Sequence, residues 1–415
     1  MLVKLQADVV IVGAGIIGLC TAMQITKRSS LSVVVVEQSR SLGEGSSGAS
    51  SAVCRHRYSY NEMLLLARDG INAYRHWPEF IEAAQPLAQF QNEGVLWLAD
   101  MGDSWASSES RRLEEAGIRS SILDAEQLKD RFPALNPCSL TPDTRSGEAH
   151  DCNEGAPYLL EIDGGYFDPV NALQDLSSAT RKKGVTIKFL SKIKKVLVQA
   201  GKTVGVQFAD GSSIEAPHVI NATGPWCNDV FDQLELDLSW SLKPTRIQVL
   251  HLDRPAELTG ALPVCCDMVG GIYFRTQNRG QQIILGSTLE EDEQEVVANP
   301  SDYAQTIEDD FMHAKLHALH HRIPSLPYRG TVNGYCGLYT VNRQDVHPIV
   351  GRTQIEGFYV ANGFSGHGFK LAPAIGSMLA QEITGEICDF DTGVPPAFLS
   401  IDRIPLQLDS KNVLA

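Results

Sequence analysis

The sequence predicts a two-domain α/β protein in which one domain is assembled from segments far apart in the chain. Short apolar strands run into glycine-containing turns at three distant places, ending near residues 12, 222 and 362. This pattern indicates one α/β domain that resumes after insertions. Between them, "LKPTRIQVLHL" and "GIYFRTQNRGQQIILG" are expected to form strands of a second, mostly antiparallel sheet. A chain of 415 residues is long enough for two or three domains.

The first element is a strand at residues 9–12, followed by a glycine turn and a helix. Gly13, Gly15 and Gly18 have G-x-G-x-x-G spacing, which allows a tight turn, close approach of a pyrophosphate and packing of the helix on the strand. The free amides and the dipole at the helix start favour an anion. A second strand ends at Glu37, about 20 residues beyond the last glycine, where a ribose-binding carboxylate belongs. The sequence therefore predicts a Rossmann-like domain that binds FAD or NAD, not NADP.

Two later stretches favour FAD over NAD. "GEGSSGASSAVCRHRY", at residues 43–58, is small and polar, and its amides can wrap a phosphate or the edge of an isoalloxazine ring. A simple NAD domain usually continues into another strand–helix unit instead. The strand at residues 219–222 then ends in "NATGPW", which is typical of two-domain flavoproteins.

The third turn, "GFSGHGFK" at residues 363–370, lies between a strand and a helix. Its glycines at 363, 366 and 368 are expected to let the backbone approach the flavin ring. Loop amides and the helix dipole then face the negative charge that a reduced flavin carries around N1 and the C2 carbonyl. Pro373 is expected in the first turn of the helix, where its missing amide costs little.

Together these motifs resemble the D-amino-acid-oxidase superfamily of FAD enzymes, and within it the sarcosine oxidase branch: monomeric sarcosine oxidase and the β subunits of heterotetrameric sarcosine oxidase. The matching stretches are "GSSGASS", "RHRY", "GGYFDPVNAL", "VINATGPW", "GLYTVNRQDVHPIVG" and "GFSGHGFKLAPAIG". The resemblance implies a Rossmann-like FAD-binding domain and a substrate domain with a mostly antiparallel sheet. The expected segments are 1–80, 150–235 and 330–395 for the FAD domain, 81–149 and 236–329 for the substrate domain, and 396–415 for a C-terminal tail.

The implied activity is oxidation of the C–N bond of an amino acid or N-substituted amino acid, of the sarcosine or glycine kind, to an imine by hydride transfer to flavin. Two alternatives stay open: a β-type catalytic subunit of a multi-chain amine or amino-acid dehydrogenase, and a flavin-binding protein without turnover. The expected partners are a small amino-acid-like carboxylate substrate and O2 or another electron acceptor, with partner subunits added under the first alternative.

The resemblance also implies site residues. In the sarcosine oxidase branch the substrate carboxylate is held by the arginine of an "RHxY" stretch and the lysine that ends "GHGFK", which correspond to Arg55 and Lys370. Arg57 is a competitor for the first role. Tyr339 and Tyr273 complete the expected catalytic set. Contacts with FAD are expected from Gly13, Ala14, Gly15, Ile16, Ile17, Gly18, Glu37, Gln38, Ser46, Ser47, Ser50, Ser51, Val196, Ala222, Thr223, Gly224, Trp226, Gly337, Gly363, Phe364, Ser365, Gly366, His367, Gly368, Phe369 and Lys370.

Departures from the branch are informative as well. Ile284 stands where monomeric sarcosine oxidase has a lysine that activates oxygen, so a dehydrogenase role gains weight. Gly337 stands where the flavin-linking cysteine belongs, with Cys336 one residue away. We therefore expect FAD to be bound non-covalently.

Composition excludes several other classes of function. A formal net charge of −15 disfavours nucleic acid as a partner, and no apolar run suggests a membrane span. The nine cysteines are scattered without a CxxC, which favours a reducing, cytoplasmic location and argues against a zinc site. His313, His317 and His321 are spaced for metal on one helical face, but an amphipathic helix with a solvated histidine edge is favoured, so no metal is predicted.

Overall fold

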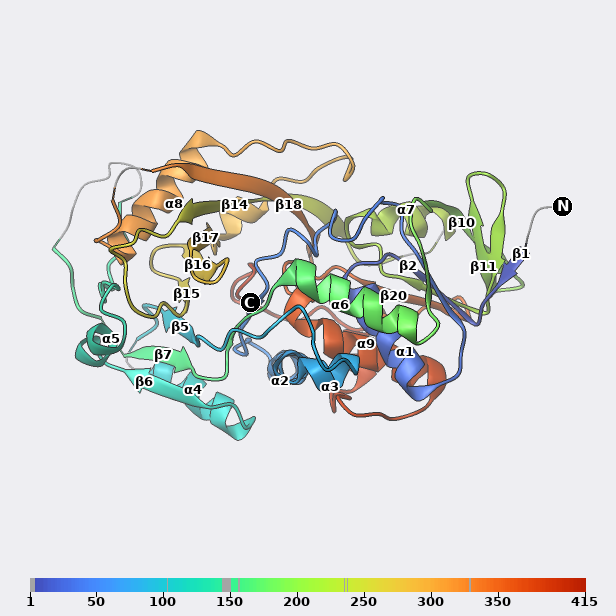
Figure 1. Cartoon of the computed structure of the whole chain (residues 1–415), viewed down its shortest axis with the longest axis horizontal. Helices are drawn as coiled ribbons and strands as arrows, with labels where there is room; N and C mark the ends of the chain where they lie inside the picture. The colour runs from blue at the N-terminus through green and yellow to red at the C-terminus, as the bar shows by residue number, and fades with distance from the viewer. Residues whose placement is uncertain are drawn as a thin grey trace.

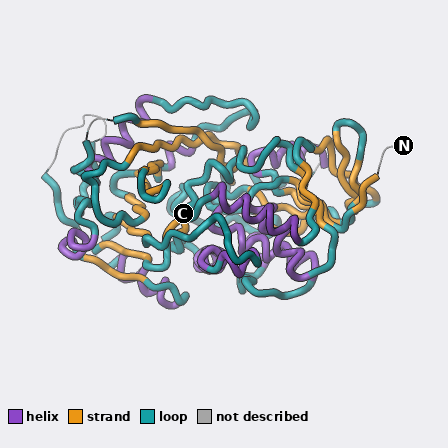
Figure 2. The backbone as a smooth tube through the Cα atoms, viewed as in Figure 1, coloured by secondary structure: helices purple, strands orange, loops and turns teal. Residues whose placement is uncertain are grey.

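A computed structural model describes residues 4–102, 104–143, 151–155, 157–234, 236, 238–327 and 330–415. Two sheet systems lie at opposite ends of the molecule, and loops connect them (Figure 1, Figure 2). The helix-rich end holds a mostly parallel sheet, and the strand-rich end holds a large, mostly antiparallel one. The α/β fold class predicted from the sequence is confirmed.

A six-stranded sheet forms the centre of the helix-rich end. Five strands are parallel and one edge strand is antiparallel. In spatial order they are β19 (Ile349–Arg352, the antiparallel edge), β20 (Phe358–Asn362), β13 (His218–Asn221), β2 (Val9–Val12), β3 (Val33–Val36) and β9 (Thr186–Lys188). The strands β2 and β3 are wholly apolar and buried, because both faces of the sheet are covered at its centre.

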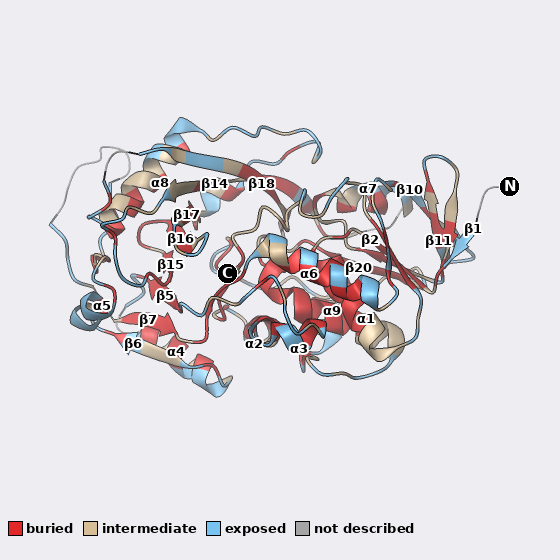
Figure 3. Cartoon of the chain, viewed as in Figure 1, coloured by how far each residue is buried: buried red, intermediate tan, exposed pale blue. Residues whose placement is uncertain are grey.

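Alternate residues of β2 face different layers. Val9 and Ile11 belong to a core shared with helices α1 (Ile16–Arg28) and α9 (Gly368–Thr384). Val10 and Val12 point to the other face, where they share a second core with a smaller sheet. This alternation follows from the two-residue period of a strand. The smaller sheet contains β1 (Lys4–Gln6), β12 (Ser213–Glu215), β11 (Lys202–Phe208) and β10 (Ile193–Gln199). Helices α2 (Asn61–Arg75), α3 (Trp77–Ile81) and α6 (Pro169–Lys182) complete the helical layer, and Figure 3 shows α9 and α1 largely buried.

The strand-rich end is an eight-stranded sheet in which one neighbouring pair, β15 with β5, is parallel. Its spatial order is β18 (Val332–Asn342), β14 (Leu242–Asp253), β17 (Gln282–Ser287), β16 (Ile272–Gln277), β15 (Val264–Asp267), β5 (Val95–Leu98), β7 (Tyr158–Glu161) and β6 (Ser120–Leu123). The predicted strands β14, β16 and β17 are present and pair antiparallel. Helix α8 (Asp309–Arg322) packs Phe311, Ala318 and Leu319 against the apolar side chains on one face of this sheet.

Smaller elements join these parts. They are β4 (Val53–Cys54) paired with β8 (Gly165–Tyr166), helices α4 (Trp105–Glu115), α5 (Ala125–Arg131) and α7 (Cys227–Phe231), and the 3-10 turns η1 (Gly224–Trp226), η2 (Asp232–Leu234), η3 (Glu290–Glu293) and η4 (Pro396–Leu399). Two strands pair in a different sheet from the rest of their expected segments. The strands β7 and β18 lie in the expected FAD segments 150–235 and 330–395, but both pair within the eight-stranded sheet.

The prediction for Pro373 was wrong. Helix α9 begins at Gly368, earlier than expected, so Pro373 lies beyond the first turn. A proline there cannot donate to the carbonyl four residues earlier, which belongs to Phe369. The Tyr74 hydroxyl donates to that carbonyl instead, at 2.7 Å. A side chain from α2 thus satisfies the group that the proline leaves open.

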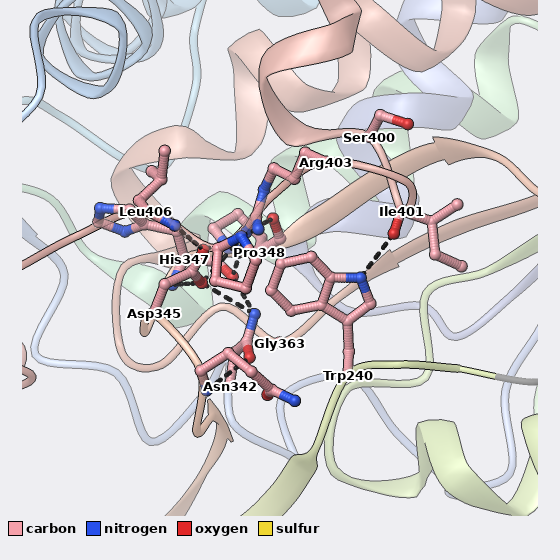
Figure 4. Close-up of polar contacts among 12 residues, drawn as sticks. Trp240, Asn342, Asp345, His347, Pro348, Gly363, Ser400, Ile401, Arg403 and Leu406 are labelled. Atoms are coloured by element: carbon pink, nitrogen blue, oxygen red, sulfur yellow. Dashed lines mark hydrogen bonds and ion pairs between the residues drawn. The ribbon is translucent and has the colours of Figure 1, made fainter.

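The segment after α9 returns to the middle of the molecule, where Figure 1 places the chain end. It is anchored on the way (Figure 4). The indole nitrogen of Trp240 donates to the Ile401 carbonyl at 2.6 Å, and Arg403 pairs with the buried Asp345 at 2.7 Å. Residues 413–415 are 9%, 6% and 4% exposed. The last three residues of the expected tail therefore pack against the fold, whereas Ile404 within it is exposed.

Candidate active site

A large open cavity lies at the carboxyl ends of the parallel strands. Its empty space, solvent mouth included, is ≈ 1960 Å³. The ends of β2, β3 and β13 form one wall, and β14 and β18 of the eight-stranded sheet contribute another. Ligands of open α/β sheets bind at this edge, where strand order reverses. The lining extends from the glycine turn after β2 to Lys370 of α9, so both ends of an extended dinucleotide could lie along it.

The first glycine turn forms the floor of the cavity. Gly13 has a φ of +110°, and a Cβ there would lie 2.4 Å from the Ala222 carbonyl oxygen. The carboxylate of Glu37 accepts hydrogen bonds from the backbone amides of Ala14 and Ser39, each at 2.8 Å. The Ser47 hydroxyl accepts from the Ile16 amide at the start of α1, at 2.9 Å. These features fit the phosphates and ribose of FAD: backbone amides at the start of α1, a carboxylate at the end of β3, and a turn too tight for any side chain at position 13.

Most of the residues expected to contact FAD line this cavity; the exceptions are Gly18, Val196, Gly363 and His367. Gly18 supports the turn, since a Cβ there would lie 2.0 Å from the Gly13 carbonyl oxygen. Val196 is buried between two sheets, and residues 191–193 line the cavity in its place. The space beside Gly363 faces Leu242, not a ligand, and its φ is +76°.

Arg55 and Lys370 come from opposite ends of the chain and meet in the cavity. Both line it, and they are 2% and 4% exposed. The Arg55 guanidinium lies 4.2 Å and the Lys370 ammonium 5.7 Å from the centre of the Tyr58 ring. Burial, together with the charge of Arg55, lowers the pKa of Lys370 to about 7. Within the described parts of the chain, no carboxylate forms an ion pair with either cation.

Glu161, which sequence reasoning missed, fixes the loop that carries Arg55. It is completely buried. One carboxylate oxygen accepts from the His56 amide at 2.6 Å and lies 3.0 Å from His56 Nδ1; the other accepts from the Arg57 amide at 3.0 Å and the Trp97 indole at 2.8 Å. Burial raises its pKa, but the hydrogen bonds and charge of His56 outweigh this, so the pKa lies below its usual value. Its partners are 64 to 105 residues away, so no local motif could reveal it.

The alternative arginines are occupied by other contacts. Arg57 lies 3.3 Å from the Glu109 carboxylate. Arg275 donates to the Ser51 carbonyl at 2.6 Å and to that of Thr276 at 2.7 Å. Arg275 therefore ties the loop at residues 43–51 to β16. Neither Arg57 nor Arg275 lines the cavity, whereas Arg55 lines it together with Lys370, although Arg55 also donates to the Val413 carbonyl.

Tyr273 and Tyr339 both line the cavity, as expected. Burial raises the pKa of each phenol, so both remain neutral. Glycines make room for the rings, because a Cβ at Gly286 would lie 2.5 Å from the Tyr273 ring and one at Gly366 would lie 2.6 Å from the Tyr339 ring.

The departures noted in the sequence can also be located. Gly337 lines the cavity, whereas the neighbouring Cys336 thiol contacts the Thr306 carbonyl at 3.6 Å. Ile284 is buried in β17 opposite Arg275 of β16, so the two share one face of the sheet. An apolar residue thus occupies the position where the resemblance expects a lysine.

One group of three metal-ligand side chains occurs in the described part of the chain. The ligand atoms of Cys138, Cys152 and His321 lie within 4.8 Å of one another. None of the three lines the cavity. Among the described helices, none is both long and apolar enough to cross a membrane.

A family model described as "FAD dependent oxidoreductase" (DAO) matches residues 8–382. The chain belongs to this family. FAD-dependent oxidoreductase domain-containing protein 1 of Mus musculus is 27% identical over 404 residues, which cover 91% of this chain and 81% of that protein. Dimethylglycine dehydrogenase, mitochondrial, of Mus musculus is 25% identical over 396 residues, which cover 92% of this chain and 42% of that protein.

Solved structures agree on the fold. The L-proline dehydrogenase from P. horikoshii superposes with a TM-score of 0.80 at 22% identity, covering 96% of this chain and 98% of that one. As a member of the DAO family, this chain is an FAD-dependent oxidoreductase, and FAD is its cofactor. The predicted family and cofactor are confirmed.

Proposed function

We propose that this DAO-family protein oxidises the C–N bond of an amino acid or N-substituted amino acid, of the sarcosine or glycine kind, to an imine. The observation that carries the proposal is the pair of buried cations, Arg55 and Lys370, above Tyr58 at the cavity wall. Two buried like charges are costly unless an anion joins them. A substrate carboxylate meets this need, because a guanidinium binds it bidentately and an ammonium adds a point charge.

The chain's own residues orient and select the substrate. Arg55 and Lys370 bind the carboxylate, and the Tyr58 ring face stabilises both cations. Tyr273 and Tyr339 limit the space beside the amine. The amine gives up a proton before the neighbouring carbon loses a hydride. The resulting imine hydrolyses in water to a carbonyl compound and ammonia, or an amine where the nitrogen is substituted. Bound FAD supplies the electron acceptor for this oxidation.

An anaerobic screen tests the proposal. Amino acids and N-methyl amino acids are mixed with the FAD-loaded protein, and bleaching of the flavin absorbance is followed. Each ligand is paired with the amine that lacks its carboxylate. We expect bleaching by the amino acid and little by the matched amine.

Arg55→Ala and Lys370→Met should each weaken binding of the substrate by about 1.5–3 kcal/mol, the value of a charge-assisted hydrogen bond. Arg181→Ala removes an exposed arginine of α6 and should change nothing. Equal turnover of amines and amino acids would contradict the proposal.

The second candidate is a catalytic subunit of a multi-chain dehydrogenase. Ile284 favours it, because a buried apolar side chain at this position gives no charge to help O2 accept electrons. In this case an artificial dye should reoxidise the reduced protein much faster than air does. Size-exclusion of the protein expressed with neighbouring genes would reveal partner subunits.

A further inference from the structure

Val413 contacts the carboxylate-binding arginine and a buried acid at the same time. Its backbone carbonyl accepts from Arg55 Nη2 at 2.5 Å, and its backbone amide donates to Glu293 Oε1 at 3.1 Å. The next carbonyl, that of Leu414, accepts from Arg57 at 3.1 Å. Val413 and Leu414 both line the cavity. A single residue of the chain thus spans the distance between Glu293 and Arg55.

Glu293 is placed to bind a cation. It is 4% exposed, and its Oε2 has no hydrogen-bond partner among the residues that the structure describes. Burial raises its pKa to about 8, although the hydrogen bond from Val413 acts in the opposite direction. Burial raises the pKa of Tyr273 and Tyr339 as well, and the charge of Glu293 raises both further. Glu293 itself does not line the cavity, but Val413, which donates to it, does. A buried carboxyl with a free oxygen favours a positive partner.

We propose that Glu293 is the amine-binding group of the substrate site, and that Glu293 and Arg55 together select an α-amino acid, which takes the position occupied here by Val413. This inference rests on the proposed function, because it assigns the carboxylate to Arg55.

The covalent geometry of Val413 explains the selection. The amide nitrogen that meets Glu293 and the carbonyl carbon beside Arg55 are separated by one Cα. The amine and the carboxylate of an α-amino acid are separated by the same N–Cα–C unit. A β-amino acid has one carbon more, and a simple amine lacks the group that meets Arg55. N-alkylated α-amino acids remain suitable because their nitrogen keeps an N–H to donate.

Substrate and chain therefore compete for one position. The anchor formed by Trp240, Asp345 and Arg403 lies upstream, so residues that follow Lys411 can leave the cavity while the anchor holds (Figure 4). Their departure breaks the hydrogen bond from Asn412 to the Thr288 carbonyl, at 2.9 Å, the one from Arg57 to the Leu414 carbonyl and the contacts of Val413. It also uncovers the buried side chains of residues 413–415.

Two ligands of matched shape test the role of Glu293. In 2-aminoisobutyrate and pivalate the central carbon carries two methyl groups and a carboxylate, and the fourth substituent is an ammonium or a methyl group. That carbon bears no hydrogen in either compound, so it cannot lose a hydride. Binding to the FAD-loaded protein is measured by isothermal titration calorimetry.

Glu293→Gln should weaken binding of 2-aminoisobutyrate roughly tenfold or more and leave the affinity for pivalate unchanged. Glu291→Gln removes an exposed carboxylate of the same turn and should change neither affinity. A loss shared equally by both ligands, or no loss, would overturn the assignment of Glu293.

Competition with the chain is tested at Val413. Val413→Pro removes the backbone N–H that donates to Glu293, whereas Val413→Ala keeps it. The proline variant should therefore bind 2-aminoisobutyrate more tightly than the alanine variant does. Equal or weaker binding would overturn the competition. Two other results would show that the proposed function itself is wrong. Either neither ligand binds, or Arg55→Ala leaves the affinity for pivalate unchanged. If Arg55→Ala weakens pivalate binding while Glu293→Gln has no effect, only the amine-binding role fails.

Discussion

Replacing Glu161 with alanine should destabilise the protein and weaken carboxylate binding, although Glu161 does not line the cavity. The change leaves four donors without their acceptor: the amide and ring of His56, the Arg57 amide and the Trp97 indole. Each unsatisfied buried donor costs about 1–3 kcal/mol, but neighbouring losses are not additive. Breaking a buried charged pair costs about 3–5 kcal/mol. We expect Glu161→Ala to lower the free energy of unfolding by an amount in this range.

Two milder variants grade the effect. Glu161→Gln keeps the size and one carbonyl oxygen, so about half of the loss should remain. Trp97→Phe removes one donor and leaves the carboxylate with His56 and Arg57, so it should cost about 1 kcal/mol. Urea unfolding followed by tryptophan fluorescence measures these differences for Glu161→Gln and Glu161→Ala, and pivalate calorimetry reports the position of Arg55.

Acid pH provides an independent check on Glu161. Its pKa is lower in the folded protein than in the unfolded chain, so its contribution is present above the unfolded value of about 4.3 and is lost as pH falls through the folded value. The stability difference between the wild-type protein and Glu161→Gln should therefore narrow at acid pH. A loss below about 1 kcal/mol for Glu161→Ala at pH 7, or unchanged pivalate affinity, would refute the reasoning.

Four further outcomes are expected. Because the pKa of Lys370 is lowered to about 7, carboxylate affinity should fall as pH rises through this value while the lysine loses its proton, and Lys370→Met should abolish that pH dependence in calorimetry. Acid precipitation should release yellow FAD into the supernatant, since Gly337 offers no thiol for a link; colour in the pellet would contradict this. Ile284→Lys should speed aerobic reoxidation of the reduced protein, measured by stopped flow, and lower its stability by several kcal/mol; fast reoxidation of the unmodified protein would contradict the reasoning. Tyr74→Phe should lower the free energy of unfolding by about 1 kcal/mol in urea. The loss should be smaller in a Pro373→Ala background, where the backbone N–H of residue 373 can donate to the Phe369 carbonyl. An equal loss in both backgrounds would argue against the pairing of Tyr74 with that carbonyl.

Sequence reasoning succeeded where the deciding residues are close together in the chain. The glycine turn and Glu37 lie within one strand–helix–strand unit, and the structure places that unit at the cavity. The alternating strands of the second sheet were also readable, because burial on one face leaves a two-residue period. Lys370 and Arg55 could be paired only through resemblance, since 315 residues separate them and no local pattern connects them.

The residues that were missed depend on contacts across the fold. Glu161 ends an apolar strand and Glu293 is one of four consecutive acids, so neither stands out in the local sequence. Each is defined by partners that lie about a hundred residues away. The start of α9 was placed too late because Pro373 suggested a first turn. The compensating hydroxyl of Tyr74 comes from another helix and leaves no mark in the local sequence.

The strand order of the parallel sheet also has a consequence for the newly made chain. β2 and β3 emerge from the ribosome early, but β13 appears almost two hundred residues later and β20 more than three hundred residues later. Until then the valine-rich strands β2 and β3 lack the neighbour on their inner edge and the cover of α9. Pairings between such distant segments form slowly and leave apolar surface exposed in the meantime. The cofactor turn is thus among the first elements synthesised and among the last to be completed, and efficient production of this protein should depend on chaperones that hold its first strands.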